Sequence, residues 1–347
     1  MFSRLRPLTS YSHPLRRLIC STRLQSASSI GPSFHKISDE ANIKTIAGRV
    51  DLDLFREVAW VPQSPLLHQR LHNFPAVQKW FLSGGANGHI SFTDYMKAYE
   101  DTVLSYEFTT SPGSGTQALP IFQAWLRESR AYGQSYLPTI IDAIIQSSNE
   151  AQESPNNASN FQQFSAPLSL IMSACQFNNT QAHPSQRVTH LYVAQSDINH
   201  LPEPLSQDVP VPDLVRHAGK GDIYSSSIWL GLQPTYTPLH RDPNPNLFCQ
   251  LVGRKKIRLM KPSQGDDTYA RIRRELKSHG NSRFRGTEMM GGRERELLHC
   301  AVWENEAVSE VFLNPGDALF IPTGWWHSVA SSGDNGALNA SVNWWFR

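Results

Sequence analysis

Two residues able to hold a metal stand two positions apart in the stretch TPLHRDPNPNLFCQLVGRKKIRLMKP, residues 237–262. Residues two apart in a β-strand share a face, so His240 and Asp242 direct an imidazole nitrogen and a carboxylate oxygen toward one place. A further histidine, His327, follows the turn-rich segment LNPGDALFIPTGWW. Two histidines and one carboxylate on one side of a metal leave its other positions open, as in non-haem Fe(II) oxygenases. A His-x-Asp pair alone is a weak signal, because a histidine is more often an ordinary surface or core residue.

A lysine in the same stretch adds to this signal. Lys255 shares its strand face with Ile257 and Leu259, which are apolar and are expected to lie inside the protein. An ammonium group that points inward is strongly disfavoured unless an anion neutralises it. The pattern therefore predicts a metal close to an acidic ligand.

These residues need β-structure to bring them together. After His190 the chain consists mainly of short strand-like runs: HLYVAQ, SSSIWLGL, LFCQLVG, KKIRLM, SEVFL, DALFIP and SVNWWF. Many short strands separated by Gly, Pro, Asn and Asp indicate a β-sandwich or barrel. The segment LVGRK predicts a hairpin around Gly253.

The rest of the chain is expected to surround this β-region. Residues 39–189 have mainly helical signals, and residues 147–165, SSNEAQESPNNASNFQQFS, predict a long polar surface loop. Residues 190–347 form the predicted barrel, which a basic insertion interrupts at about 264–305. The insertion opens with a helical pattern, GDDTYARIRRELKSHG. The predicted fold class is mainly β with flanking helices, an α+β arrangement.

Charge is distributed unevenly along the chain. Residues 1–38 contain six of the 32 basic residues and no acidic residue, which leaves 26 basic against 30 acidic residues in the remainder. An Arg- and Ser-rich segment without acids is typical of a mitochondrial transit peptide. The alternative is a disordered basic tail, with the cytoplasm or nucleus as the location. The mildly acidic remainder argues against a protein that binds nucleic acid over its whole surface.

Two further classes of protein are disfavoured. The four cysteines lie far apart and form no C-x-x-C pair, which argues against a zinc ribbon and a disulfide framework. No apolar run approaches the roughly 20 residues that a membrane span requires, so no membrane span is expected.

Three motifs, read in order, resemble a known family. Residues 237–262, the segment LNPGDALFIPTGWWHSV and the terminal SVNWWF are similar to the JmjC, or cupin-8, hydroxylases, which depend on Fe(II) and 2-oxoglutarate. The resemblance is to the compact hydroxylase branch and extends from Phe55 to Arg347. It implies a double-stranded β-helix, which is a jelly-roll or cupin barrel. It also implies that His240, Asp242 and His327 are the catalytic iron ligands.

The same resemblance implies a 2-oxoglutarate pocket. Lys255 matches the lysine that pairs with the distal carboxylate of 2-oxoglutarate, and Thr237 and Tyr192 match hydroxyl groups that help to hold it. Two amides and two aromatic walls complete the implied pocket: Asn246, Asn343, Trp229 and Trp345. Each has an alternative interpretation, since Thr237 fits a turn before a proline and the tryptophans fit the core of any barrel.

The implied activity is that of an Fe(II)- and 2-oxoglutarate-dependent oxygenase, with O2 as the second co-substrate, that hydroxylates or demethylates a protein or peptide side chain. Two alternatives stay open: an oxygenase acting on RNA or a small molecule, with the basic insertion as the only support for RNA, and a cupin barrel that binds a ligand without turnover. The spacer between Asp242 and His327 is longer than that branch usually has. Related asparaginyl hydroxylases dimerise through helices after the last strand, and the chain ends at Arg347, so a monomer or weak dimer is expected.

Overall fold

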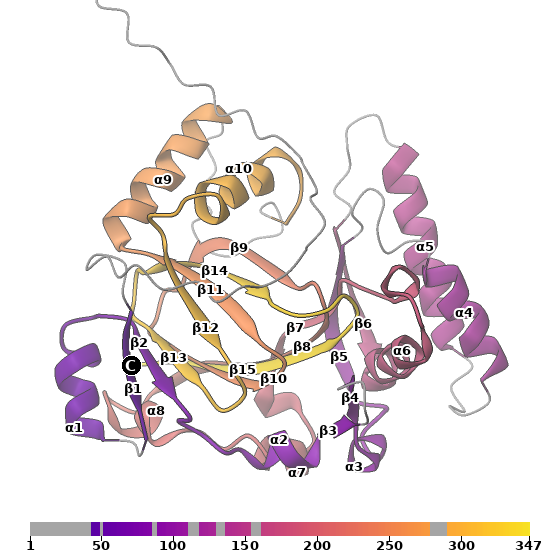
Figure 1. The fold of residues 1–347 in the computed structure, drawn as a ribbon, viewed down its shortest axis with the longest axis horizontal. Helices are drawn as coiled ribbons and strands as arrows, with labels where there is room; N and C mark the ends of the chain where they lie inside the picture. The colour runs from indigo at the N-terminus through magenta and orange to yellow at the C-terminus, as the bar shows by residue number, and fades with distance from the viewer. Residues whose placement is uncertain are drawn as a thin grey trace, which may run out of the picture. The chain divides into compact units, whose positions relative to one another are not determined.

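Two β-sheets hold the residues that are expected to do chemistry (Figure 1). The structure is a computed structural model that describes residues 43–48, 51–84, 89–109, 118–129, 136–153, 161–277 and 290–347. Residues 37–347 form one unit, and the predicted transit peptide, residues 1–38, lies outside the described residues. None of the described helices has the length and apolarity needed to cross a bilayer.

The strands form one large sheet, one small sheet and a separate pair. The nine-stranded sheet has the order β1 (Lys44–Ala47), β2 (Leu66–Gln69), β13 (Ala318–Ile321), β10 (Asn246–Val252), β15 (Leu338–Phe346), β8 (Ile223–Leu232), β7 (Leu191–Asp197), β5 (Val103–Thr109) and β6 (Phe161–Pro167). The four-stranded sheet has the order β12 (Ser309–Leu313), β11 (Lys255–Met260), β14 (Trp326–Ser331) and β9 (Tyr236–Arg241). The antiparallel pair is β3 (Phe81–Gly84) and β4 (His89–Phe92).

Apolar side chains fill the space between the two sheets. The cluster takes residues from both sheets: Leu67, Phe248, Leu319 and Ile321 from the large one and Ile257, Leu259, Val311, Leu313 and Val329 from the small one. Along β11 the inward residues alternate with half-buried Lys256 and Arg258, as expected for a sheet with one covered face. Seven predicted strand runs are confirmed, and the arrangement is the expected jelly-roll type of sandwich with flanking helices.

The predicted hairpin at Gly253 is wrong. Gly253 does turn the chain, with φ at +69°. However, β10 pairs with β13 and β15, whereas β11 pairs with β12 and β14. The turn therefore carries the chain from the large sheet to the small one, and Lys255 approaches the space between the sheets from the small sheet.

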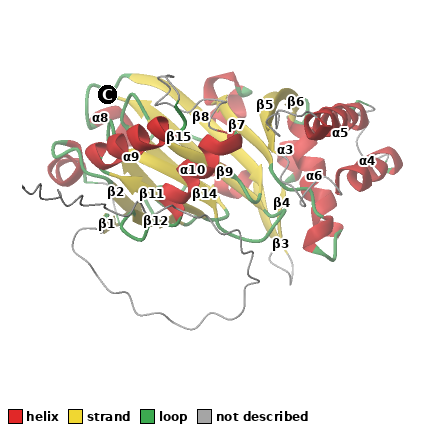
Figure 2. Ribbon diagram, turned by 90° about the horizontal axis from the view of Figure 1, so that it is seen from above, coloured by secondary structure: helices red, strands yellow, loops and turns green. Residues whose placement is uncertain are grey.

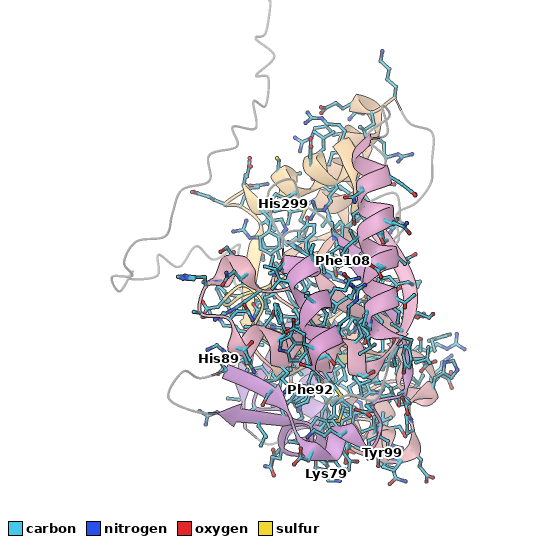
Figure 3. All side chains as sticks on the ribbon, turned by 90° about the vertical axis from the view of Figure 1, so that its right-hand side faces the viewer. Lys79, His89, Phe92, Tyr99, Phe108 and His299 are labelled. Carbon is cyan, nitrogen blue, oxygen red and sulfur yellow. The ribbon has the colours of Figure 1, made fainter. Side chains whose placement is uncertain are left out.

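Helices cover the outer faces of the sheets. They are α1 (Leu52–Phe55), continued by a π-helix (Arg56–Trp60), α2 (Pro75–Lys79), α3 (Asp94–Lys97), α4 (Ala118–Glu128), α5 (Leu137–Glu153), α6 (Leu168–Thr180), α7 (Glu203–Gln207), α8 (Asp213–His217), α9 (Pro262–Glu275) and α10 (Gly292–Trp303), with 3-10 turns at Pro184–Gln186 and Ile198–His200. Figure 2 shows α4, α5 and α6 grouped beside β5 and β6. Figure 3 views this side, with Phe108 of β5 near the helices and His89 and Phe92 on the β3–β4 pair.

The N-terminal part contains the predicted helices, α1 to α6, but it also contributes β2, β5 and β6 to the large sheet. The predicted polar loop at 147–165 is also wrong over most of its length. Helix α5 continues to Glu153 and β6 begins at Phe161. Glu, Gln and Ala are good helix formers, so a polar sequence here extends a helix.

The basic insertion consists of α9 and α10 in the described residues, and it lies over the outer face of the small sheet (Figure 1). The predicted helix at its start is confirmed as α9. A separate apolar cluster joins the two: Leu239, Met260 and Trp326 of the sheet pack with Tyr269, Ile272, Leu297, Leu298 and Val302 of the insertion. The small sheet is thus covered on both faces.

Candidate metal centre and co-substrate cavity

The three predicted metal ligands converge between the sheets. His240 of β9 and His327 of β14 are directly opposed residues of neighbouring antiparallel strands, with ring centres 4.2 Å apart. Asp242 follows the end of β9. Its Oδ1 lies 3.9 Å from His240 Nε2, and its Oδ2 lies 3.5 Å from His327 Nε2. One ligand atom from each residue lies within 4.8 Å of the others. Cross-strand pairing and strand parity therefore assemble the cluster.

Hydrogen bonds set both imidazole rings in the orientation that a metal needs. His240 Nδ1 lies 2.8 Å from the carbonyl oxygen of Pro238, and His327 Nδ1 lies 3.2 Å from that of Trp325. A carbonyl oxygen only accepts, so each Nδ1 is the donor, and in the neutral imidazole the lone pair is then on Nε2. Both Nε2 atoms face Asp242. A set of two neutral imidazoles and a carboxylate fits Fe(II), and the donor atoms present fit the predicted ion.

A chain of buried hydrogen bonds holds Asp242. Trp229 Nε1 donates to Asn343 Oδ1 at 2.7 Å, Asn343 Nδ2 donates to Asn246 Oδ1 at 3.1 Å, and Asn246 Nδ2 donates to Asp242 Oδ2 at 2.9 Å. An indole N–H can only donate, so Trp229 sets the direction of both amides. The last amide then presents a donor to the carboxylate.

A cavity of about 240 Å³ opens beside the triad. Nine of the ten predicted site residues line it: Tyr192, Trp229, Thr237, His240, Asp242, Asn246, His327, Asn343 and Trp345. In its wall the indole Nε1 of Trp345 is buried and has no hydrogen-bond partner among the described residues. A buried donor without a partner is unfavourable and is uncommon in folded proteins.

The tenth predicted residue, Lys255, lies behind this lining and is 1 % exposed. Its Nζ donates to the hydroxyl of Tyr192 at 3.2 Å and lies 5.7 Å from the ring centre of Phe248. Burial lowers the pKa of Lys255 from 10.5 to about 7. Tyr192 and Phe248 are both neutral, so the ammonium form of Lys255 is suited to bind the carboxylate of an incoming anion.

Sequence reasoning missed several residues of the cavity, among them Gln195, Tyr224, Arg241 and Phe248. Phe248 could have been found by parity, because it shares a strand face with Asn246. Tyr224 is 46 % exposed at the start of β8, and no local pattern in the sequence distinguishes it from a surface residue.

Comparisons with known proteins agree with this geometry. The family model described as "Cupin-like domain" matches residues 53–347. The chain is 34% identical over 158 residues to "Lysine-specific demethylase 8" of Danio rerio, which covers 45% of this chain and 36% of that protein. It is 30% identical over 158 residues to "Lysine-specific demethylase JMJ30" of Arabidopsis thaliana (45% and 33%) and 30% identical over 150 residues to "JmjC domain-containing protein D" of Dictyostelium discoideum (40% and 32%). The chain spans about a third of the length of these curated relatives.

Proposed function

Because the chain belongs to the family of cupin-like domains, in agreement with its resemblance to the JmjC hydroxylases, we propose that it is an Fe(II)- and 2-oxoglutarate-dependent oxygenase. The observation that supports this most is the convergence of His240, Asp242 and His327 beside a cavity, with the buried amino group of Lys255 behind the cavity wall. Iron, 2-oxoglutarate and O2 together supply the oxidation of a C–H bond, with succinate and CO2 as the other products.

The side chains of the protein would bind the iron and the co-substrate, orient them and exclude water. His240, Asp242 and His327 would hold the iron from one side. Lys255 would neutralise the distal carboxylate of 2-oxoglutarate, with Tyr192 and Thr237 donating hydrogen bonds from their hydroxyl groups. Tyr192 already contacts Lys255, and Thr237 lines the cavity. The low exposure of these residues keeps water from the reacting groups.

The wall of the cavity would orient the co-substrate further. Asn246 and Asn343 present amide groups to the cavity, and Trp229 and Trp345 form aromatic sides. Exposed Tyr224 lies at the part of the cavity lining that is open to solvent, where a substrate side chain would enter.

For the substrate we propose a side chain of a protein, with lysine as the first to test because two relatives are named lysine-specific demethylases. Hydroxylation of a methyl group on nitrogen leads to loss of that carbon, so one site serves hydroxylation or demethylation. RNA is the weaker alternative, because two of the basic residues of the insertion pair with acids inside it: Arg273 pairs with Glu294, and Arg293 pairs with Glu275 and Glu296.

Succinate release tests the class of protein. The wild-type chain with Fe(II), 2-oxoglutarate and O2 should form succinate, and His240→Ala should not. If the chain binds 2-oxoglutarate but forms no succinate with any substrate tested, it is a binding module instead. Mass spectrometry of cellular proteins and RNA for +16 changes that disappear with the gene would identify a hydroxylated substrate and decide between protein and RNA.

Location and assembly also belong to the proposal. We propose mitochondrial import, supported by the six basic residues and the absence of acids in residues 1–38. A fluorescent reporter fused to about the first 40 residues tests it, and a diffuse signal would leave the segment as a basic tail. A monomer or weak dimer stays a prediction, and light scattering at low micromolar concentration is its test.

A further inference from the structure

All four residues that flank the two metal histidines along the chain contact the insertion. Leu239 and Arg241 flank His240, while Trp326 and Ser328 flank His327. Side chains alternate along a strand, so neighbours of an inward histidine point outward. The outer face of β9 and β14 is the face that α9 and α10 cover (Figure 1).

Helix α9 contacts both strands that carry the metal histidines, β9 and β14, through the carboxylate of Asp266. Asp266 Oδ1 accepts hydrogen bonds from Trp326 Nε1 and from the guanidinium of Arg241, both at 3.2 Å. The backbone of α9 lies directly against the indole, since a Cβ on Gly265 would come within 2.1 Å of Trp326 Cδ1. Glycine alone permits this approach, and β9 and β14 are thereby tied to one helix.

Helix α10 contacts the same strands at the other neighbour of His327. Trp303 Nε1 donates to Ser328 Oγ at 3.0 Å, and Ser328 Oγ donates to the carbonyl oxygen of Thr237 at 2.8 Å. The hydroxyl of Ser328 therefore links α10, β14 and β9. Leu239, on the same face, packs in the apolar cluster that includes Leu298 of α10.

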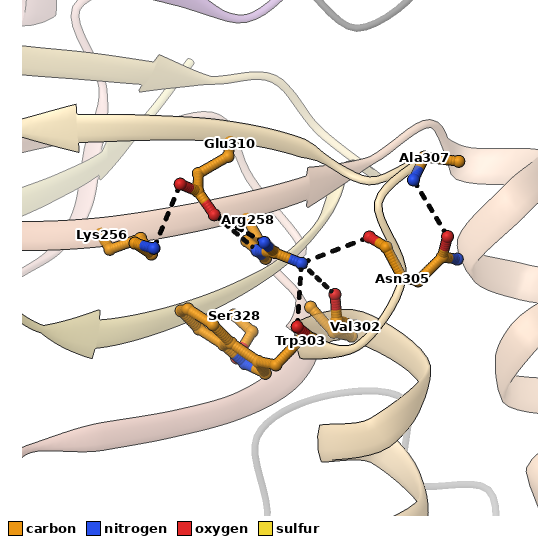
Figure 4. Close-up of polar contacts among 8 residues, drawn as sticks. All are labelled: Lys256, Arg258, Val302, Trp303, Asn305, Ala307, Glu310 and Ser328. Carbon is orange, nitrogen blue, oxygen red and sulfur yellow. Dashed lines mark hydrogen bonds and ion pairs between the residues drawn. The ribbon is translucent and has the colours of Figure 1, made fainter. Parts of the chain in front are cut away.

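Arg258 of β11 fixes the end of α10 onto the sheet, as Figure 4 shows. Its guanidinium donates to the carbonyl oxygens of Val302, Trp303 and Asn305 at 2.8, 3.2 and 3.2 Å. Glu310 neutralises it at 2.7 Å. The last carbonyls of a helix lack partners within the helix, so this arginine places Trp303 in a defined position over Ser328.

The small sheet alone gives the histidines limited support. In the described sheet β9 is an edge strand that pairs with β14 alone. The register between β9 and β14 is irregular between His327 and Val329. The insertion supports β9 on its outer face instead, where Leu239 packs in the shared apolar cluster and Arg241 binds Asp266.

We propose that the insertion positions His240 and His327 for the metal, with Asp266 and Trp303 as its main positioning residues; this inference rests on the metal centre proposed above. Loss of a side chain that orients metal ligands typically lowers metal affinity about 10- to 100-fold. Asp266→Ala and Trp303→Phe should each therefore weaken binding of Mn(II), used in place of iron, by about tenfold or more.

Glu275 offers a matched control on the same helix. Its carboxylate forms an exposed ion pair with Arg293 inside the insertion, 3.5 Å long. Glu275→Ala removes the same chemical group as Asp266→Ala but should leave Mn(II) affinity unchanged. The affinities are measured by calorimetry and by electron paramagnetic resonance, and the unfolding midpoint of each metal-free protein is measured beside them.

Four outcomes are distinguished by these measurements. Weaker Mn(II) binding by Asp266→Ala and Trp303→Phe, at unfolding midpoints close to that of Glu275→Ala, supports the proposal. Wild-type Mn(II) affinity in either folded variant overturns it and leaves the insertion as a cover for the sheet. If Asp266→Ala does not fold, Trp303→Phe decides alone, because it keeps an aromatic ring at this position and removes the indole N–H donor. A wild-type chain that binds no Mn(II) would instead reject the metal centre itself.

Discussion

Replacing Lys255 with methionine is the sharpest test of the co-substrate cavity. The change keeps a long unbranched side chain and removes the charge. Burial lowers the pKa of Lys255 from 10.5 to about 7, and at 1.36 kcal/mol per pH unit this means that burial disfavours the ammonium form by roughly 5 kcal/mol relative to a lysine in water. The loss of one partner of a buried ion pair typically costs about 3–5 kcal/mol. Lys255→Met should therefore weaken 2-oxoglutarate binding by roughly two orders of magnitude or more.

The pH dependence gives a second signature with a definite sign. A bound carboxylate favours the protonated lysine, so its pKa rises on binding. Above about pH 7 the free protein holds a neutral Lys255, and binding must take up a proton. The affinity of the wild-type protein for 2-oxoglutarate should then fall by up to about tenfold per pH unit above this value. Lys255→Met should show no such slope.

The neighbouring lysine is the control. Lys256 lies on the opposite face of β11, with its Nζ 3.1 Å from Glu310 Oε1. Lys256→Met should bind 2-oxoglutarate as the wild-type protein does. The assay is calorimetry with Mn(II) in place of iron, without O2, between pH 6.5 and 9. Equal affinities of Lys255→Met and wild type across this range would refute the role of Lys255.

Three other predictions follow from the site and the core. His240→Ala should abolish Mn(II) binding and succinate formation while the circular dichroism spectrum stays that of the folded protein. Trp229→Phe removes the donor that orients Asn343 and should weaken Mn(II) binding about tenfold, whereas Trp345→Phe, which removes an indole N–H outside that chain, should not. Burial lowers the pKa of His72 to about 4, so between pH 6.5 and 4 the unfolded chain binds more protons than the folded protein. The free energy of unfolding should therefore fall as the pH drops from 6.5 toward 4, and it should fall less steeply in His72→Phe. Urea titrations at several pH values measure this.

Local patterns were sufficient for much of the site. Strand parity placed Lys255 with Ile257 and Leu259, and all three are buried. The resemblance supplied the other cavity residues, which the structure brings together around one space. The contacts among these residues could not be predicted from local patterns. Trp229 and Asn343 are hydrogen-bonded across the neighbouring strands β8 and β15, and no local signal specifies that pairing.

Long-range pairing explains the errors as well. The glycine at 253 predicts a turn correctly, but turn chemistry does not decide whether the next strand returns to the same sheet. In the same way, β2 and β5 read as ordinary segments of a helical region, and only their partners β13 and β7 make them part of the large sheet. The position of the insertion on the outer face likewise depends on tertiary packing.

The opposition of His240 and His327 has a consequence for how the protein folds. The two strands are adjacent in the sheet, yet β10, β11, the whole insertion, β12 and β13 lie between them in the chain. Closing so long a loop loses chain entropy before any contact compensates it, and proteins dominated by such contacts fold slowly. The helices of the insertion, packed on one another, shorten the effective loop. We therefore expect competence to bind metal to arise late in refolding, after the insertion has formed.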